Sequence, residues 1–163
     1  MSQANQMFAL TNEAIESEAL KERLKDDRAG ALLIFEGVVR NHNEGKKVSA
    51  LSYEACESLA QTEAERIFAE ARQRFEIVNC IVVHRVGDLQ VGDAAVFVGV
   101  STAHRDQAYS ASRFLIDEIK KRLPIWKKEH YTDASSAWVN CAHQEADHKH
   151  DHRHDQSREH QPC

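Results

Sequence analysis

Several features that mark common protein classes are missing from this 163-residue sequence. No segment approaches the roughly 18 consecutive apolar residues that a membrane-spanning helix needs. The first thirty residues do not combine a basic start with a long apolar run, which is the pattern of a secretion signal. We therefore expect a cytoplasmic protein.

The sequence also contains few cysteines, and they are poorly placed for joint chemistry. Cys56, Cys80, Cys141 and Cys163 lie far apart in the chain and form no C-x-x-C pair. This spacing indicates neither a zinc site nor a dithiol redox motif, so we expect reduced, structural thiols.

Motifs for nucleotide-driven or standard hydrolase chemistry are absent. No G-x-G-x-x-G, P-loop, H-E-x-x-H or G-x-S-x-G pattern occurs. Nucleic-acid binding is disfavoured as well, because the formal net charge is -5 and only 7% of the residues are aromatic. Binding to duplexes or single strands rests on a broad basic field and on stacking rings.

The remaining composition, with 42% hydrophobic and 29% charged residues, is typical of one globular domain. Hydrophobic periodicity predicts helices within residues 11–27, 58–75 and 105–123. It predicts strands or extended pieces at residues 6–10, 30–40, 48–56, 78–89, 92–103, 125–129 and 137–139. Adjacent strands joined by turns indicate an α+β domain with mainly antiparallel strands and two or three main helices.

The second predicted helix has the clearest amphipathic pattern. Its apolar stripe begins at Leu59 and ends at Phe75, and Ser58 is a plausible N-cap with Gln61 three residues later. The third helix is expected to end at Pro124, since proline removes a backbone donor and disfavours helical angles in the preceding residue.

The composition changes abruptly at His143. Residues 143–163 contain six histidines and no large apolar side chain, so we expect a disordered tail after a domain spanning residues 1–142. The alternating HKHDHRH segment is open to two interpretations, a solvated tail or a collector of divalent metals. No fixed geometry follows from such a segment, and we predict no metal site.

Two short polar segments are candidates for anion binding. In VVRNHN, residues 38–43, Arg40 follows an apolar strand, where it is either a turn residue or a planar fork of donors for a phosphate or carboxylate. In STAHRDQA, residues 101–108, His104 and Arg105 open a helix. Cations oppose the helix dipole at that end, so their placement favours a bound anion over a purely structural start.

The segment IKKRLPIWKK, residues 119–128, concentrates positive charge around a proline. Cations in the last turn of a helix are stabilised by its dipole, which accounts for Lys121 and Arg122 as solvated residues. Lys127 lies beyond Pro124, so a chain that folds back at the proline brings Lys120 and Lys127 to one pocket. Two ammonium groups held together there would lower each other's pKa and favour acid–base chemistry.

The segment HRVGDLQVGD, residues 84–93, contains two Gly-Asp dipeptides around a short apolar stretch. We interpret it as a tight loop between strands, with a structural role favoured over a catalytic one.

Four segments, FEGVVRNHN, VVHRVGDLQVGD, VFVGVSTAHR and IKKRLPIWKKE, together resemble the catalytic (large) subunit of molybdopterin synthase, the MoaE family. The resemblance extends from about residue 30 to residue 139. It implies an α/β hammerhead fold and a homodimer within a heterotetramer. The partner is a small ubiquitin-like sulfur carrier, whose C-terminal Gly-Gly thiocarboxylate donates sulfur to cyclic pyranopterin monophosphate and forms the dithiolene of molybdopterin.

The same resemblance implies site residues and no cofactor. Lys120 and Lys127 match the family's catalytic lysines. The substrate-binding positions that it implies are Val38, Val39, Arg40, His104, Arg105, Lys120, Lys127, Lys128 and Glu129. Because the carrier supplies the sulfur, no cysteine of this chain is expected to act as a nucleophile. A non-catalytic module that only binds the carrier is the alternative, but it would be expected to lack these lysine and arginine positions.

Overall fold

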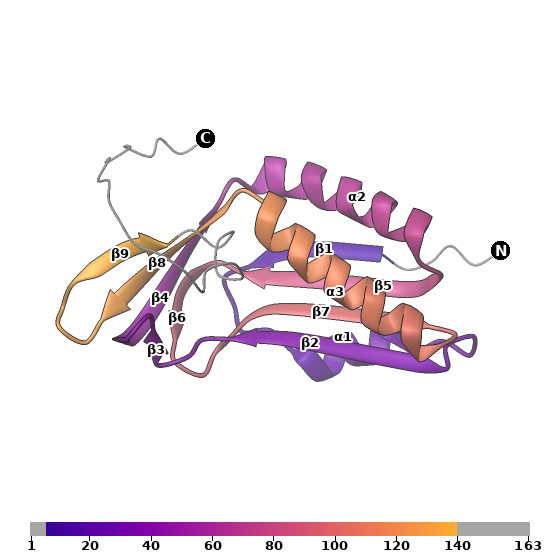
Figure 1. The fold of residues 1–163 in the computed structure, drawn as a ribbon, viewed down its shortest axis with the longest axis horizontal. Helices are drawn as coiled ribbons and strands as arrows, with labels where there is room; N and C mark the ends of the chain where they lie inside the picture. Colours follow the sequence, from indigo (N-terminus) through magenta and orange to yellow (C-terminus); the bar gives the residue numbers. More distant parts are fainter. Residues whose placement is uncertain (1–5, 140–163) are drawn as a thin grey trace, which may run out of the picture.

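The computed structural model describes residues 6–139, which form nine strands and three helices (Figure 1). Their order is β1 (Gln6–Thr11), α1 (Ser17–Leu24), β2 (Ala31–Val38), β3 (His42–Asn43), β4 (Lys46–Ala55), α2 (Glu57–Arg74), β5 (Ile77–Arg85), β6 (Gly87–Gln90), β7 (Ala94–Thr102), α3 (Arg105–Arg122), β8 (Ile125–Tyr131) and β9 (Ser136–Val139). The predicted α+β class with mainly antiparallel strands is confirmed. The predicted domain end at residue 142 and the tail from residue 143 lie outside the described residues.

The larger apolar core lies on one face of a four-stranded sheet of order β1-β5-β7-β2. β1 pairs with β5 in parallel, and the other neighbours are antiparallel. β5 and β7 are buried along nearly their whole length because both sheet faces are covered. α2 and α3 lie on one face, where Ile67, Val98 and Leu115 share a core, and α1 covers the other face through Leu24 (Figure 1).

A second, smaller sheet has the order β3-β4-β8-β9, and β6 also pairs with β4. It packs at the end of the first sheet where α3 finishes (Figure 1). Its own small core contains Val39, Val48, Leu51, Leu89, Ala95 and Tyr131. The chain therefore passes from the first sheet to the second at the end of β2, between β5 and β6, and again after α3.

The start of α2 differs from the prediction. The N-cap residue is Cys56 and no side chain caps the helix, so Ser58 is not the N-cap. The helix begins at Glu57, and each residue turns the helix by about 100°. Leu59 consequently points away from the sheet and is 58% exposed, while Ala60 beside it is fully buried.

The end of α3 follows the prediction. The helix stops at Arg122, and Leu123 adopts extended backbone angles before Pro124. The backbone N–H of Cys56 donates to the carbonyl of Pro124 at 3.1 Å, which joins the start of α2 to this turn. Cys56 is disulfide-bonded, contrary to the expectation of reduced thiols. Cys80 is free, and its burial raises the pKa of the thiol to about 12.

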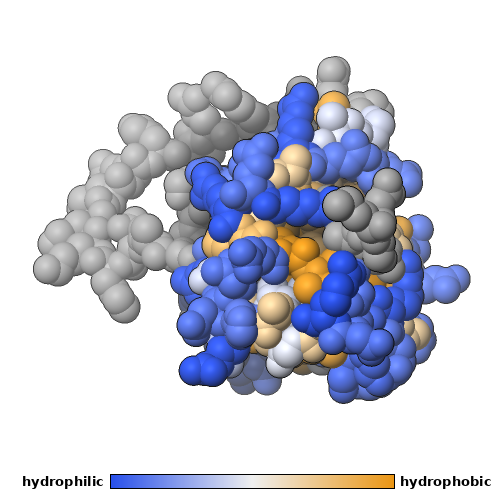
Figure 2. Space-filling model, turned by 90° about the vertical axis from the view of Figure 1, so that its right-hand side faces the viewer, coloured by the Kyte–Doolittle hydropathy of each residue, from blue (hydrophilic) through white to orange (hydrophobic). Residues whose placement is uncertain are grey.

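Figure 2 shows the end of the molecule where α3 begins, which is the end away from the second sheet. Apolar residues gather near the centre of this face, and hydrophilic residues surround them. Within residues 6–139, no helix has both the length and the apolar character required to cross a membrane.

Candidate functional site

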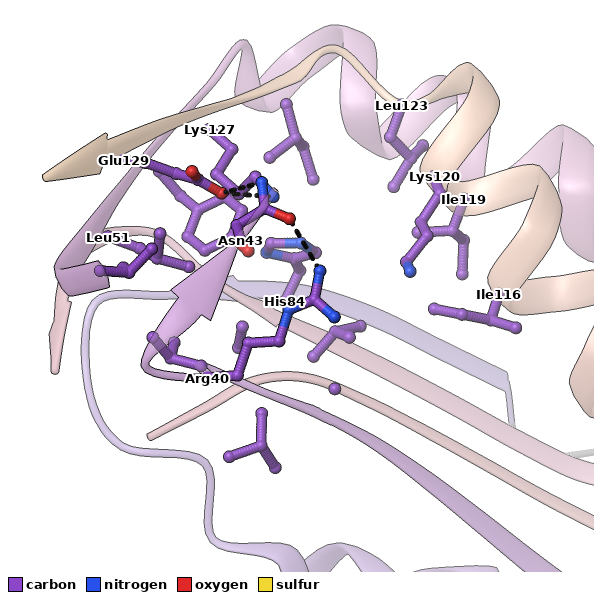
Figure 3. Close-up of a pocket in the computed structure, with 18 of the residues that line it drawn as sticks. Arg40, Asn43, Leu51, His84, Ile116, Ile119, Lys120, Leu123, Lys127 and Glu129 are labelled. Carbon is purple, nitrogen blue, oxygen red and sulfur yellow. Dashed lines mark hydrogen bonds and ion pairs between the residues drawn. The ribbon is translucent and has the colours of Figure 1, made fainter. Parts of the chain in front are cut away.

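A cavity of about 370 Å³ lies where the two sheets and the end of α3 meet (Figure 3). The end of β2, the strands β3, β4 and β8, and the last turns of α3 all contribute side chains. The lining residues are Gly37, Val38, Val39, Arg40, His42, Asn43, Val48, Leu51, Tyr53, His84, Ala95, Val96, Ile116, Ile119, Lys120, Leu123, Ile125, Lys127 and Glu129.

β8 supplies polar groups to the cavity through the two-residue period of a strand. Lys127, Glu129 and Tyr131 are buried, whereas Lys128 and His130 between them are partly exposed. Lys127 pairs with Tyr53 of β4, and Glu129 pairs with Leu51. This register turns one lysine of the Lys127–Lys128 pair inward and the other outward.

The last turns of α3 form the opposite wall. Ile116, Ile119 and Leu123 present an apolar surface at helical spacing, and Lys120 lies on the same face, four residues after Ile116. Lys120 is exposed. Lys120 and Lys127, on two elements separated by Pro124, line one cavity (Figure 3). The prediction that these two lysines face one pocket is confirmed.

Glu129 is the centre of a buried polar network. Glu129 is only 2% exposed. Oε1 accepts a hydrogen bond from Asn43 Nδ2 at 2.9 Å and lies 3.3 Å from Lys127 Nζ, while Oε2 accepts from the Tyr131 hydroxyl at 3.0 Å. A buried carboxylate needs such partners because desolvation is otherwise unfavourable. Burial, followed by this carboxylate, raises the pKa of Tyr131.

Asn43 links this network to Arg40. The guanidinium of Arg40 donates to Asn43 Oδ1 at 2.8 Å. Asn43 is held by a two-residue hairpin in which Glu44 and Gly45 both have positive φ, 46° and 78°. This is the turn geometry that favours tightly paired strands, and glycine adopts it without steric cost. A local turn thus carries the amide that connects Arg40 to Glu129.

The end of β2 forms the floor of the cavity beside Arg40. The register between β2 and β7 shifts between Gly37 and Val38, which indicates a bulge. Val39 is then buried, and its N–H donates to the carbonyl of Asp93 at 2.9 Å. A Cβ on Gly37 would lie 2.7 Å from Val96 Cγ1, so only glycine allows this close approach.

His84 also lines the cavity, from the end of β5 (Figure 3). Its ring packs edge-on against Tyr53, with the two ring centroids 5.0 Å apart. Burial lowers the pKa of His84 to about 4. The segment after it was predicted to be one tight loop, but it contains the strand β6, which pairs with β4, between two turns where Gly87 and Gly92 have positive φ. No local pattern indicated that His84 would line a cavity.

Three predicted binding residues lie outside the cavity of their own chain. His104 and Arg105 stand exposed at the start of α3. Arg105 is 15 residues before Lys120, which corresponds to about 22 Å along the helix axis. Lys128 faces away from the cavity, and its ammonium lies 5.6 Å from the centroid of the Trp138 ring. Their roles in binding stay predictions.

Arg122 is not solvated as predicted. Its guanidinium contacts Glu63 at 2.6 Å and Glu70 at 2.9 Å, both on α2, and Glu118 at 3.2 Å. Only 22% of its side chain is exposed. The cation therefore ties α3 to α2, and Lys121 remains the exposed, solvated member of the pair.

The lining of the cavity suits a ligand that is both anionic and partly apolar. Three cationic side chains, those of Arg40, Lys120 and Lys127, line it with one carboxylate, that of Glu129. Aliphatic residues complete the walls. Residues 6–139 contain no cluster of three His, Cys, Asp or Glu side chains that could hold a metal ion.

Comparison with known proteins gives a consistent assignment. A family model described as MoaE protein matches residues 10–122. A molybdopterin synthase catalytic subunit from Nostoc sp. is 40% identical over 134 residues, covering 82% of this chain and 81% of the relative. The crystal structure of molybdopterin synthase from Staphylococcus aureus has a TM-score of 0.75 and 36% identity, covering 80% of this chain and 94% of that chain.

A more distant structural neighbour is the complex of subunits 1 and 2 of molybdopterin-converting factor from Helicobacter pylori. Its TM-score is 0.67 at 20% identity, and the match covers 84% of this chain and 91% of that chain. At this identity the likeness concerns the fold.

Proposed function

The chain belongs to the MoaE protein family, and from this premise we propose that it is the catalytic subunit of a molybdopterin synthase. It transfers sulfur from the C-terminal thiocarboxylate of a small carrier subunit to cyclic pyranopterin monophosphate. Two such transfers produce the dithiolene of molybdopterin. The relative from Nostoc sp. carries the name of this subunit.

The observation that carries the proposal is the meeting of Lys120 and Lys127 in one cavity with Arg40. The substrate has a phosphate and the carrier tail ends in an anionic thiocarboxylate, so the site must hold two negative groups together. The cationic donors come from three different parts of the fold and can bind both anions, and the apolar walls between them can contact a planar heterocycle.

The two lysines have different surroundings and therefore different proposed roles. Lys127 is buried and paired with Glu129, which fixes its ammonium in position. Lys120 is exposed and has no ion pair within residues 6–139, so its ammonium is available to an incoming anion. Both stabilise the phosphate-bearing intermediate and move protons as the thiocarboxylate sulfur bonds to the pterin side chain and water cleaves the acyl carbon–sulfur bond, which leaves the carrier with a C-terminal carboxylate.

The proposed partners are the carrier subunit and a second copy of this chain. The Helicobacter pylori complex of subunits 1 and 2 of molybdopterin-converting factor supports the first. A dimer would also give His104 and Arg105 a role, because about 22 Å of helix separates Arg105 from Lys120 within one chain. We propose that these two residues act in the cavity of the partner copy. The cytoplasmic location predicted from the sequence remains part of the proposal.

Reconstitution tests this function directly. The full chain is mixed with a thiocarboxylated carrier and cyclic pyranopterin monophosphate, and molybdopterin is quantified. We expect two sulfur atoms transferred per product and continued turnover when all four cysteines are replaced by serine. Binding of the carrier without formation of molybdopterin would instead identify a non-catalytic binding module.

A further inference from the structure

His84 has a defined tautomer in the cavity. Its Nδ1 lies 2.8 Å from the backbone carbonyl oxygen of Arg85. A carbonyl only accepts hydrogen bonds, so Nδ1 must carry a proton and donate it. Because the pKa of His84 is lowered to about 4 by burial, the ring is neutral near pH 7. Nε2 therefore carries a lone pair and no proton.

The lone pair on Nε2 is not used by the protein. His84 Nδ1 has a hydrogen-bond partner, but no group within residues 6–139 forms a hydrogen bond with His84 Nε2. Among the buried side-chain nitrogen and oxygen atoms of those residues, only Arg85 Nε lacks a partner. The Nε2 atom is consequently not sealed inside the protein, and the ring that bears it lines the cavity (Figure 3). Its acceptor is open to a ligand.

The neighbouring groups make this acceptor distinctive. Arg40, Lys120 and Lys127 bring donors to the cavity. Both carboxylate oxygens of Glu129 already have partners within the protein, and Asn43 Oδ1 accepts a hydrogen bond from Arg40. An anion binds well to such a set of donors, but the N–H or O–H groups of a heterocycle need an acceptor. His84 supplies one on the inner side, beneath the apolar wall of α3.

We propose that His84 Nε2 is a specificity-determining acceptor, which binds an uncharged N–H or O–H group of the heterocyclic part of the substrate. This inference rests on the proposed function, since it assigns the recognition of the pterin to a residue distinct from the cations that bind the anionic groups. The Nδ1 bond to Arg85 and the edge contact with Tyr53 fix the ring before the ligand arrives. Preorganised acceptors discriminate strongly, because a ligand that cannot donate leaves them unpaired.

Two substitutions separate the acceptor from the shape of the ring. His84→Phe keeps a flat ring beside Tyr53 and removes the acceptor, while His84→Gln places an amide oxygen near the position of Nε2. His130→Phe is the matched control, because His130 lies on the outward face of β8 and bonds to Ser52 outside the cavity. Each full-length variant is assayed with thiocarboxylated carrier for kcat and KM, and its affinity for inorganic phosphate is measured by calorimetry.

We expect His84→Phe to raise the KM for cyclic pyranopterin monophosphate by about tenfold to hundredfold, with kcat within about threefold of the unmodified chain. His84→Gln should recover most of the loss, and phosphate affinity should change less than about twofold in both variants. His130→Phe should leave both kinetic constants unchanged.

Three results would overturn the inference. An unchanged KM in His84→Phe shows that no ligand donor uses Nε2. Equal losses of substrate and phosphate affinity show a structural role, and a loss in kcat alone shows proton transfer. Failure of the unmodified chain to form molybdopterin is a separate outcome, which refutes the proposed function itself.

Discussion

Lys127 Nζ lies 3.3 Å from Glu129 Oε1, and both side chains are almost completely buried, two residues apart on the inward face of β8. A buried ion pair of this kind stabilises little by itself, because desolvation offsets the attraction. The ion pair instead fixes the position of the Lys127 ammonium. Lys127 is held in place before any ligand arrives, whereas Lys120 on the facing helix is exposed.

Replacing Lys120 by alanine should abolish formation of molybdopterin from preformed thiocarboxylated carrier while the chain stays folded. The side chain is exposed, so the free energy of unfolding should change by less than about 0.5 kcal/mol. Turnover and urea denaturation measure the two effects. Lys121→Ala is the matched control, since Lys121 is exposed and does not line the cavity. Near-normal turnover in Lys120→Ala would contradict the assignment.

Glu129→Gln should destabilise the protein by about 3 kcal/mol, because it removes the charge that compensates the buried ammonium of Lys127. Urea denaturation at pH 7 measures this loss. In the double variant Lys127→Met with Glu129→Gln no buried cation remains, so we expect it to be more stable than Glu129→Gln alone. If the losses of the single variants Lys127→Met and Glu129→Gln add up to the loss of the double variant, the two residues are not coupled.

Mixing two inactive variants tests whether Arg105 acts in the partner copy. Arg105→Ala and Lys120→Ala chains, each inactive alone, should regain about a quarter of the activity when refolded together. A random mixture makes half of its dimers mixed, and each mixed dimer has one intact site of two. The yield of molybdopterin measures the recovery. No recovery, with mixed dimers shown by native mass spectrometry, would place both residues in one chain's site.

The free energy of unfolding should fall as the pH is lowered from about 6.5 to about 4. The pKa of His84 is about 4 in the folded state, below its ordinary value. The unfolded chain therefore binds the extra proton over that interval, which costs stability. The expected contribution is about 3 kcal/mol, fully present above pH 6.5. His84→Phe should flatten this part of the curve measured by urea denaturation, and an unchanged slope would assign it to other groups.

Arg122→Ala should lower the free energy of unfolding by about 1 to 2 kcal/mol, since it removes two ion pairs that join α2 and α3 and a third within α3. The loss should shrink at 1 M salt because the pairs are partly exposed and screened. Lys121→Ala again serves as the control. If Arg122→Ala lowers the free energy of unfolding no more than Lys121→Ala does, the ion pairs of Arg122 do not stabilise the fold.

The sequence by itself determined the elements and part of the site. Hydrophobic periodicity located the helices and strands, because burial on one face repeats every 3.6 or two residues whatever the neighbours are. Pro124 determined where α3 ends, since its ring excludes helical geometry locally. That break was sufficient to predict that Lys120 and Lys127 meet. The place of Arg40 at the end of a strand made it a candidate anion ligand, and the family resemblance made it a predicted binding residue.

Only the tertiary structure decided what surrounds these residues. Glu129 was expected from the family resemblance, but its partner Asn43 is 86 positions away in the chain. His84 resembled a loop residue, and only the folded structure places its ring edge-on against Tyr53 of β4. Arg122 pairs with Glu63 and Glu70, which lie on α2. Arg105 and Lys120 lie near opposite ends of α3. Burial, hydrogen-bond partners and pKa depend on contacts between segments distant in the chain, which no local pattern of residues contains.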